Sequence, residues 1–487
     1  MKVETATLKD GKTKDYMMVS DPPSGTMKEV YFTPDRREVI CFYKDSQAGQ
    51  DPARAQRLES IIGKYNPTLP RSQGGSAASD VDAAYYRNLF CWPTSIVTRP
   101  RFGLVTPTYP GNFFFQEGPC KGQEKNGAWF TLEKPRSILQ RMAPKELGNW
   151  LNYLRLCIKM ARAVARLHQA GLAHSDLSNN NVLVDPLNGA SVVIDIDSLV
   201  VPGLYPPDVL GTKGYIAPEV LSTLSLPFRD PSRKHPSART DEHALAVLFY
   251  QYLLQRHPLE GRRIPKANTA EEQDFLTYGP QALYCEHPQD KSNRPEAAKF
   301  VSVSALGPWL EDLFQRAFVD GVKDANRRPT ASEWLKGLVK TFDRTIPCGN
   351  ANCPQQWYVL LDRGGVVCPF CGTKARQPVP LLRFRSEGRP GQWIQDGSLA
   401  VYHHLQLYKW HAFANLFPGP DSDLTPQAYF AWHGGQWLML NQNLTSLTSA
   451  EGNRVPAGQA IALTPGAKIR MSQEPNGRIA EVEMRQP

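Results

Sequence analysis

One stretch near the middle of the chain carries polar side chains at spacings that suit a particular chemistry. His174-Ser175-Asp176-Leu177 is followed by Asn181, and Asp195 comes after a short apolar run. Phosphoryl transfer needs a carboxylate that accepts and orients a hydroxyl group, together with hard oxygen ligands for Mg²⁺. Asp176 suits the first role, and Asn181 and Asp195 suit the second.

These side chains can meet only if the chain between them folds back on itself. Val182–Val184 and Ser191–Ile194 are predicted strands, joined by a turn at 185–189. A β-hairpin of this length returns Asp195 to the side of the other two residues. The alternative is an Asn-rich loop between a helix and an apolar strand, without a chemical role.

The stretch resembles the catalytic loop and metal-binding segment of eukaryotic-like protein kinases. In that family His-Arg-Asp-Leu, three variable residues and Asn precede a hairpin and then Asp-Phe-Gly. Here Asp195-Ile196-Asp197 stands at the last position. The resemblance implies a bilobal kinase fold that binds ATP with Mg²⁺ or Mn²⁺, with Asp176 as catalytic base and Asn181 and Asp195 as metal ligands.

Three departures from the family pattern carry expectations about mechanism. Ser175 replaces an arginine that in many kinases holds a phosphorylated activation loop, so we expect activity without such phosphorylation. Ser178 stands where a lysine contacts the transferred phosphate, and slow catalysis is the expected cost. Asp197 replaces a flexible glycine, which argues against large swings of this segment.

Residues 1–110 are predicted to form the amino-terminal lobe of the kinase. Val30–Phe32 and Val39–Tyr43 are predicted strands, and a helix is expected from Asp51-Pro52 onward. Lys44 closes the second strand. By the resemblance it binds the α- and β-phosphates of ATP, and we expect Glu59 of the helix to be its partner.

Two further nucleotide contacts are implied in this lobe. The phosphate-covering loop of the family has three glycines, whereas residues 21–28 contain only Gly25, so low ATP affinity or turnover is expected. Phe102–Pro107 is the predicted last strand and hinge, and alignment places the adenine contact near Val105. Residues 71–80 are rich in Ser, Gly and Ala and predict a flexible insertion.

Residues 111–345 are predicted to form the second, mostly helical lobe. Apolar residues at helical spacing predict a helix over Leu147–Ala170 that ends at Gly171. Further on, 211–219 resembles the end of a kinase activation segment. The resemblance implies an ion pair between Glu219 and Arg328, an Asp241 that braces the catalytic loop from beneath, and a contact of the Thr212 hydroxyl with the catalytic aspartate.

A second class of phosphotransferase has to be weighed against protein kinases. Small-molecule kinases of the aminoglycoside and choline type share His-x-Asp-Leu-x-x-x-Asn and an Ile-Asp-x-Asp sequence, which Ile194-Asp195-Ile196-Asp197 matches. They lack the Ala-Pro-Glu segment and its arginine. Because Ala217-Pro218-Glu219 and Arg328 are present here, a protein substrate is favoured.

Four cysteines in residues 346–376 have the spacing of a zinc ribbon. Cys348 and Cys353 precede a strand-like run, and Cys368 and Cys371 follow it in a Cys-Pro-x-Cys-Gly sequence. Four thiolates close a tetrahedral Zn²⁺ site and leave no ligand position open, so a structural role is expected. Four clustered thiols without metal are the alternative.

Residues 377–487 are predicted to form a small all-β sandwich, because short apolar runs alternate with Gly, Pro and Asn. The layout resembles a forkhead-associated domain, a family that binds phosphothreonine through Arg and Ser-x-x-His. Tyr408 stands where that serine should be, and no matching Gly-Arg is visible. The expected role is therefore a protein-interaction module.

Composition narrows the remaining choices. A chain of 487 residues suggests more than one domain, and its net charge of +9 is spread without a basic run, so nucleic acid is an unlikely partner. The first residues lack the apolar core of a signal peptide, the longest apolar run is too short to span a bilayer, and scattered cysteines suit reduced thiols. We expect a cytoplasmic protein without membrane contact.

The sequence thus predicts an α+β protein, a bilobal kinase fold followed by a zinc ribbon and a β-sandwich. This combination resembles the serine/threonine kinase of bacterial tellurium-resistance-associated phosphorylation triads. The resemblance implies protein substrates, and a von Willebrand A protein and a metal-dependent phosphatase as partners. A pseudokinase scaffold that binds nucleotide without turnover is the rival from another functional class.

Overall fold

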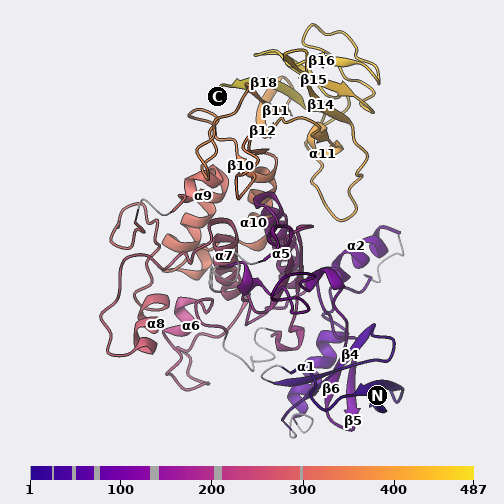
Figure 1. Ribbon diagram of the computed structural model, residues 1–487, viewed down its shortest axis with the longest axis vertical. Helices are drawn as coiled ribbons and strands as arrows, with labels where there is room; N and C mark the ends of the chain where they lie inside the picture. The colour runs from indigo at the N-terminus through magenta and orange to yellow at the C-terminus, as the bar shows by residue number, and fades with distance from the viewer. Residues whose placement is uncertain are drawn as a thin grey trace. The chain divides into compact units, whose positions relative to one another are not determined.

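The structure of the protein is a computed structural model that describes residues 2–24, 27–45, 51–70, 77–131, 142–201, 211–296 and 300–487. The chain divides into two compact units (Figure 1). Unit 1 consists of Met1–Gly148, Arg155–Phe300 and Phe314–Leu335, and unit 2 of Asn149–Leu154, Val301–Leu313 and Lys336–Pro487.

Unit 1 begins with an antiparallel six-stranded sheet of order β2-β1-β5-β6-β4-β3. Its strands are β1 (Lys2–Leu8), β2 (Thr13–Met18), β3 (Lys28–Phe32), β4 (Glu38–Tyr43), β5 (Ser95–Arg99) and β6 (Gly103–Pro107). Helices α1 (Pro52–Ile62) and α2 (Ala77–Arg87) lie between β4 and β5 in sequence. The two predicted strands and the helix beginning at Pro52 are confirmed, and the side chain of Asp51 caps that helix by accepting the N–H of Ala53.

The two faces of this sheet pack into separate cores. Ile40, Phe42 and Val105 belong to a cluster with Ala6, Leu8 and Tyr16. Tyr43 and Leu104 belong to another cluster with Leu58 of α1. Successive side chains of a strand point to opposite faces, so the neighbours Phe42 and Tyr43 serve different cores. Along β4, every second side chain therefore lies on the face that α1 covers, and the side chains between them lie on the other face.

The first two strands were absent from the prediction, because residues 2–18 are mostly polar. Their pairing runs from Lys2 opposite Met18 to Thr7 opposite Thr13. The signal that could have found them is Asp10-Gly11, a pair typical of hairpin turns, and Gly11 has a φ of +83° that suits such a turn. Part of the predicted flexible insertion is also helical, since α2 begins at Ala77, while residues 71–76 lie outside the described residues.

The chain from residue 142 to residue 345 is mainly helical. Its helices are α4 (Pro144–Leu147), α5 (Trp150–Gln169), α6 (Pro218–Leu221), α7 (Ala238–Leu254), α8 (Ala270–Tyr278), α9 (Pro308–Gln315) and α10 (Ala331–Phe342). One-turn elements are η2 (Gly111–Phe113), η3 (Gly127–Trp129), η4 (Ile196–Ser198), η6 (Val303–Leu306), η7 (Arg316–Asp320) and η8 (Ala325–Arg327). No helix within the described ranges is both long and apolar enough to cross a membrane.

The predicted elements around the catalytic loop are present. The helix expected over Leu147–Ala170 is α4 and α5, interrupted at Gly148, whose φ is +65°. The predicted hairpin consists of β7 (Val182–Asp185) and β8 (Ala190–Val193), with Val182 opposite Val193. It carries the chain back toward the loop that follows α5.

Unit 2 contains a small hairpin and two four-stranded sheets. The hairpin is β9 (Thr345–Pro347) and β10 (Trp357–Val359). The sheets have the orders β12-β11-β18-β17 and β13-β14-β15-β16. Their elements are β11 (Val379–Arg389), β12 (Gln392–Ala400), β13 (Gln406–Leu407), α11 (Lys409–Ala412), β14 (Ala428–His433), β15 (Gln436–Asn441), β16 (Ala460–Ala462), β17 (Lys468–Arg470) and β18 (Ile479–Arg485).

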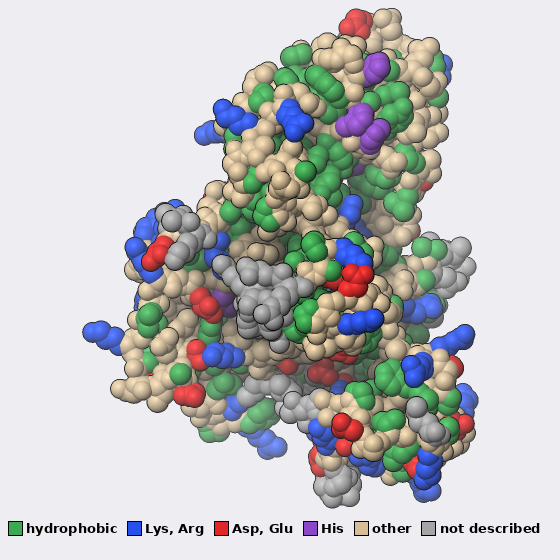
Figure 2. Space-filling view, viewed as in Figure 1, with side chains coloured by type: hydrophobic (Ala, Val, Ile, Leu, Met, Phe, Trp, Pro, Cys, Tyr) green, Lys and Arg blue, Asp and Glu red, His purple; other side chains and the backbone are tan. Residues whose placement is uncertain are grey.

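Side chains from both sheets of unit 2 share one core. Phe384 and Val482 come from the first sheet, and Phe430 and Met439 from the second. This arrangement is a sandwich of two antiparallel sheets. On the visible face of the molecule, Lys and Arg side chains are spread out and interspersed with Asp and Glu (Figure 2), which matches the diffuse charge along the sequence.

Candidate functional site

Asp176 lies in the loop between α5 and β7, and both of its carboxylate oxygens have fixed partners. The Thr212 hydroxyl donates to Oδ1 over 2.7 Å. The side-chain amide of Asn181 donates to Oδ2 over 3.0 Å and to the main-chain carbonyl of Asp176 over 2.8 Å. The predicted contact between Thr212 and the aspartate is confirmed. An aspartate held in this way is oriented for a hydroxyl group that approaches it.

The hairpin brings Asp195 back beside this loop. The N–H of Ile194 donates to the carbonyl of Asn181 over 3.0 Å, and the ring of His174 meets the carbonyl of Ile194 at 3.0 Å. Asp195 has a left-handed backbone, with φ +60° and ψ +43°, and the turn η4 follows it directly. Hydrogen bonds therefore join the segments that carry Asp176, Asn181 and Asp195, the residues that could orient a hydroxyl group and ligate a metal ion.

The donor set suits a hard divalent cation. The amide nitrogen of Asn181 is committed to Asp176, which leaves the amide oxygen for a ligand. Asp195 supplies a carboxylate, and its side chain is 35% exposed and accessible. Oxygen ligands of these two types are those that Mg²⁺ prefers.

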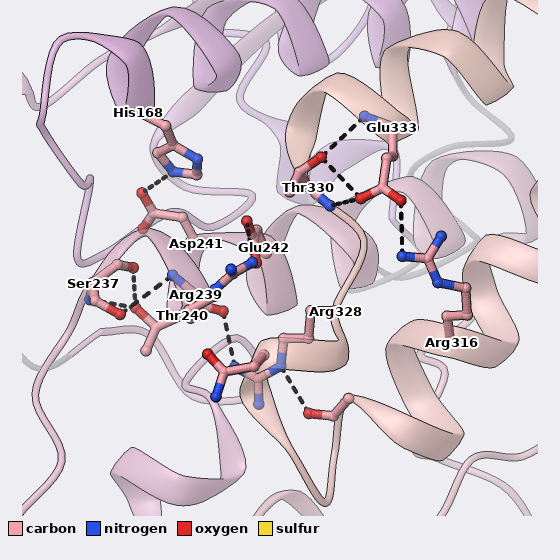
Figure 3. Close-up of polar contacts among 12 residues, drawn as sticks. His168, Ser237, Arg239, Thr240, Asp241, Glu242, Arg316, Arg328, Thr330 and Glu333 are labelled. Atoms are coloured by element: carbon pink, nitrogen blue, oxygen red, sulfur yellow. Dashed lines mark hydrogen bonds and ion pairs between the residues drawn. The ribbon is translucent and has the colours of Figure 1, made fainter.

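A buried aspartate braces the catalytic loop from beneath. Asp241, in the first turn of α7, is 1% exposed and accepts hydrogen bonds from the N–H groups of His174 at 2.7 Å and Ser175 at 3.3 Å. The ring of His168 meets the same carboxylate at 3.0 Å, as Figure 3 shows. A capping box between Ser237 and Thr240 fixes the start of the helix (Figure 3). The predicted brace is confirmed.

The predicted ion pair between Glu219 and Arg328 is also confirmed. Two guanidinium nitrogens of Arg328 donate to the two carboxylate oxygens of Glu219 over 2.8 and 2.6 Å. Arg328 also donates to the main-chain carbonyls of Gly321 and Arg239, and its side chain is fully buried. This arginine therefore ties the end of the activation segment to the helical core.

On the sheet side of the site, Lys28 contacts two carboxylates. Its Nζ lies 2.8 Å from Asp195 Oδ1 and 2.5 Å from Asp197 Oδ1, and the hydroxyl of Tyr43 donates to the other oxygen of Asp197. Burial disfavours the ammonium, but Asp197 and Asp195 outweigh it and hold the pKa of Lys28 well above its usual value. Burial also opposes the ionised Asp197, yet Lys28 and Tyr43 keep the pKa of that carboxyl lowered.

The structure corrects the predicted pair of Lys44 and Glu59. Glu59 forms its ion pair with Lys9, and both side chains are about half exposed. Lys44 follows β4 directly, and its positive charge helps to lower the pKa of Glu29, which is paired with Phe42 in the strand register, so Lys44 lies toward the face that α1 does not cover. Lys28 is paired with Tyr43 in the strand register and thus lies on the covered face. The ammonium group that contacts Asp195 and Asp197 in the structure is that of Lys28.

The other two predicted nucleotide contacts have different outcomes. Val105 is fully buried within β6, its carbonyl accepts the N–H of Thr94, and its side chain packs with Ile40 away from α1. The carbonyl and the side chain of Val105 are therefore both engaged within the sheet, whereas the prediction placed the adenine contact near this residue. Gly25 lies outside the described residues.

The four predicted cysteines lie together in unit 2. Within the described residues, the sulfurs of Cys348, Cys353, Cys368 and Cys371 all lie within 4.8 Å of one another. Cys348 follows β9, and backbone hydrogen bonds fold the second pair into a tight turn, with the N–H of Gly372 donating to the carbonyl of Cys368. Cys353 and Cys368 are almost fully buried. Four sulfurs at this separation can surround one Zn²⁺ ion.

The histidine of the forkhead-associated resemblance has a structural role in the sandwich. His411 is buried, accepts the N–H of Tyr408 over 3.0 Å and contacts the indole nitrogen of Trp410 at 3.1 Å. Its second ring nitrogen also lies 3.4 Å from the carboxylate of Asp343. These neighbours leave His411 in the packed interior of unit 2.

Comparison with known families identifies part of this chain. Residues 138–338 match the protein kinase domain. This range contains Asp176, Asn181, Asp195 and both residues of the Glu219–Arg328 pair. The chain therefore carries a protein kinase domain, and its mixed helices and strands agree with the predicted fold class.

Curated relatives share limited parts of the chain. A serine/threonine-protein kinase of Toxoplasma gondii, WNG2, is 36% identical over 99 residues, which are 20% of this chain and 17% of that protein. The human anti-Muellerian hormone type-2 receptor is 29% identical over 158 residues, 27% of each chain. A dual serine/threonine and tyrosine protein kinase of Apis mellifera is 28% identical over 199 residues, 40% of this chain and 18% of that one. The chain thus spans less than a third of the length of these relatives.

Among solved structures, a rhoptry kinase from Toxoplasma gondii is 12% identical with a TM-score of 0.40, covering 70% of this chain and 82% of that chain. The kinase domain of a Toxoplasma gondii rhoptry antigen is 11% identical with a TM-score of 0.39, covering 70% and 86%.

Proposed function

We propose that this protein is a serine/threonine protein kinase that transfers the γ-phosphoryl group of ATP to hydroxyl groups of protein substrates. The observation that carries the proposal is the fixed carboxylate of Asp176, held by Thr212 on one oxygen and by Asn181 on the other. A threonine hydroxyl at this position resembles the serine/threonine branch of the family. A serine/threonine-protein kinase supports this class at 36% identity over 99 residues, and a dual serine/threonine and tyrosine protein kinase supports transfer to protein hydroxyl groups at 28% identity over 199 residues.

The residues of the site divide the work of phosphoryl transfer. Asp176 accepts the proton of the attacking hydroxyl and orients its oxygen. Asn181 and Asp195 would hold the divalent cation, which would supply positive charge to neutralise the phosphates. Lys28 faces the same space from β3 and supplies a positive charge for the phosphates.

A protein rather than a small molecule is the proposed substrate. Small-molecule kinases lack the Ala-Pro-Glu segment and its arginine, whereas here Glu219 forms a bidentate pair with the fully buried Arg328. That pair anchors the segment on which protein kinases receive their substrates. The proposed partners include the von Willebrand A protein and the metal-dependent phosphatase of the triad resemblance, with the sandwich as an interaction module.

Transfer of radiolabelled phosphate from ATP tests this function. The wild type should label itself or an added protein substrate, and Asp176→Ala should reduce labelling by about 10²- to 10⁴-fold while it still binds ATP. Equal labelling by both proteins would refute the catalytic role of Asp176. No labelling by a wild type that binds ATP would favour the pseudokinase scaffold, and labelling of aminoglycoside or choline alone would favour a small-molecule kinase.

We also propose that the four cysteines of unit 2 bind a structural Zn²⁺ ion. The support is their mutual distance and the burial of two of them. Elemental analysis of the purified protein should find one zinc per chain. Replacement by Co²⁺ should give the visible absorbance of a tetrahedral tetrathiolate, and Cys368→Ser should abolish it. A metal-free protein with an unchanged fold in unit 2 would contradict this proposal.

A further inference from the structure

The carboxylate that holds Lys28 comes from an unexpected part of the chain. Lys28 Nζ is closer to Asp197 Oδ1, at 2.5 Å, than to Asp195 Oδ1, at 2.8 Å. The side chain of Asp197 is 11% exposed and that of Lys28 19% exposed. The Tyr43 hydroxyl occupies the second oxygen of Asp197, so every oxygen of this carboxylate has a partner on the sheet.

Helix α1 offers no carboxylate for this lysine. Glu59 is the single acidic residue of Pro52–Ile62, and it pairs with Lys9 at the surface. The groups that α1 brings toward Tyr43 are cationic instead, since the guanidinium of Arg54 lies 5.6 Å from the Tyr43 ring centre. A partner for Lys28 therefore has to come from outside the helix.

The backbone of the metal-binding segment supplies that partner. Asp195 adopts a left-handed conformation, and the one-turn helix η4 follows at once. This tight turn presents the side chains of Asp195 and Asp197 to the same ammonium group. A glycine at position 197, as in the kinase pattern, would leave Lys28 with Asp195 alone.

We propose that Asp197 is a positioning residue that holds Lys28 for the phosphates of ATP, in the role that a glutamate of the helix was expected to fill. The inference rests on the proposed function, because it assigns Lys28 to the nucleotide. In this arrangement the position of Lys28 depends on the segment that carries Asp195 and Asp197, and it does not depend on the position of α1.

The chemistry of an ammonium group supports this assignment. Lysine has three N–H donors, and the two aspartates use two of them. The third remains for a phosphate oxygen. Because two carboxylates and the Tyr43 ring, 5.8 Å away, surround the ammonium, its position is set before the nucleotide arrives.

A double-mutant cycle in the nucleotide-free protein tests the pair itself. Lys28→Met and Asp197→Asn should each lower the melting temperature by at least about 2 °C, because the first leaves the buried Asp197 without its cation and the second leaves Lys28 with Asp195 alone. The double variant should lose less than the sum of the two shifts. Lys12→Met and Asp10→Asn form a matched control, since this ion pair has side chains that are 79% and 51% exposed, and its shifts should be small and additive. Additive shifts at Lys28 and Asp197 would overturn the pair.

Binding of a fluorescent ATP analogue tests the role of the pair. In EDTA, Lys28→Met should weaken binding about tenfold to a hundredfold. Asp197→Asn and Asp197→Gly should weaken it about tenfold, with no additional loss when combined with Lys28→Met, and Asp197→Glu should restore part of the affinity. Asp197→Gly carries the residue of the kinase pattern at this position, so it serves as a second variant if Asp197→Asn does not fold.

Four outcomes would overturn all or part of the assignment. A loss in Asp197→Asn that appears only with Mg²⁺ would make Asp197 a metal ligand. If Lys44→Met weakened nucleotide binding and Lys28→Met did not, the lysine that binds the phosphates would be Lys44, at the end of β4. A wild type that binds no nucleotide would overturn the nucleotide role together with the proposed function, whereas additive melting shifts in the cycle would overturn the pair alone.

Discussion

The two halves of the site are held together by different kinds of contact. In the lower half, Asp241 and Arg328 each bond to two main-chain groups besides a side chain, and both side chains are buried. In the upper half, side-chain contacts join Lys28, Tyr43 and Asp197 to one another and to Asp195. Contacts to the main chain last as long as the fold does. Contacts between side chains depend on single residues, so the upper half is the half that one substitution can disconnect while the fold persists.

The largest effect should follow from breaking the lower half. Arg328→Met leaves Glu219 without its cation and two main-chain carbonyls without a donor. We expect a loss of about 3–5 kcal/mol in the free energy of unfolding of unit 1. Urea denaturation followed by hydrogen exchange of the peptides around α6 and α7 measures the loss and locates it.

Arg316→Met is the matched control for this variant. Arg316 pairs with Glu333 at 2.8 Å, as Figure 3 shows, but the two side chains are 35% and 42% exposed. An exposed pair contributes about 1 kcal/mol or less. If both arginine variants lost the same stability, the difference between buried main-chain anchoring and surface pairing would not hold.

A smaller effect is expected in the upper half. Tyr43→Phe removes the hydroxyl that donates to Asp197, and a hydrogen bond to a charged group contributes about 2 kcal/mol. We expect weaker ATP binding, by about tenfold, with little change in the exchange of peptides from α7. Tyr31→Phe is the control, because its hydroxyl meets Glu29 at 3.2 Å on the other core of the sheet. Equal losses in both tyrosine variants would contradict the role of Tyr43.

The smallest effect should depend on pH. Burial, aided by the positive charge of Arg328, lowers the pKa of His243 well below its usual value. Below about pH 6.5 His243 binds a proton in the unfolded chain but remains neutral in the folded chain. Its contribution to stability is therefore intact above that pH and is lost as the pH falls.

His243→Leu should remove this dependence. The stability of the variant relative to wild type should rise by up to about 1.4 kcal/mol for each pH unit between pH 6.5 and 5.5. Melting temperatures at pH 7.5 and 5.5 give the comparison. If the melting temperatures of the two proteins fell equally between pH 7.5 and 5.5, His243 would bind its proton in the folded protein as well, and the prediction would be wrong.

The lower half could be predicted because its residues recur at fixed spacings. The distance in sequence from Asp176 to Asn181 is set by one loop, and the hairpin to Asp195 is a local structure with its own turn signal. The partners Asp241 and Arg328 lie far along the chain, and the kinase resemblance supplied them. Each of these predictions agrees with a hydrogen bond in the structure.

The upper half could not be predicted in the same way because it depends on strand register. Lys44 and Val105 were each assigned to the nucleotide without knowledge of the face on which they lie. A shift of one residue along a strand moves a side chain to the other face. Lys28 became identifiable only once its pairing with Tyr43 was known, and Asp197 only once its turn was seen.

The convergence of Asp176, Asn181 and Asp195 on one cation and one phosphoryl group is tested most directly by titration of Mn²⁺ in the presence of ATP, with free Mn²⁺ measured by electron paramagnetic resonance. Asn181→Ala and Asp195→Asn should each weaken Mn²⁺ binding at least about tenfold, whereas Asp176→Asn, which changes only a partner of the Asn181 amide, should weaken it less than either ligand variant. Unchanged binding in both ligand variants, or a loss confined to Asp176→Asn, would contradict the assigned roles.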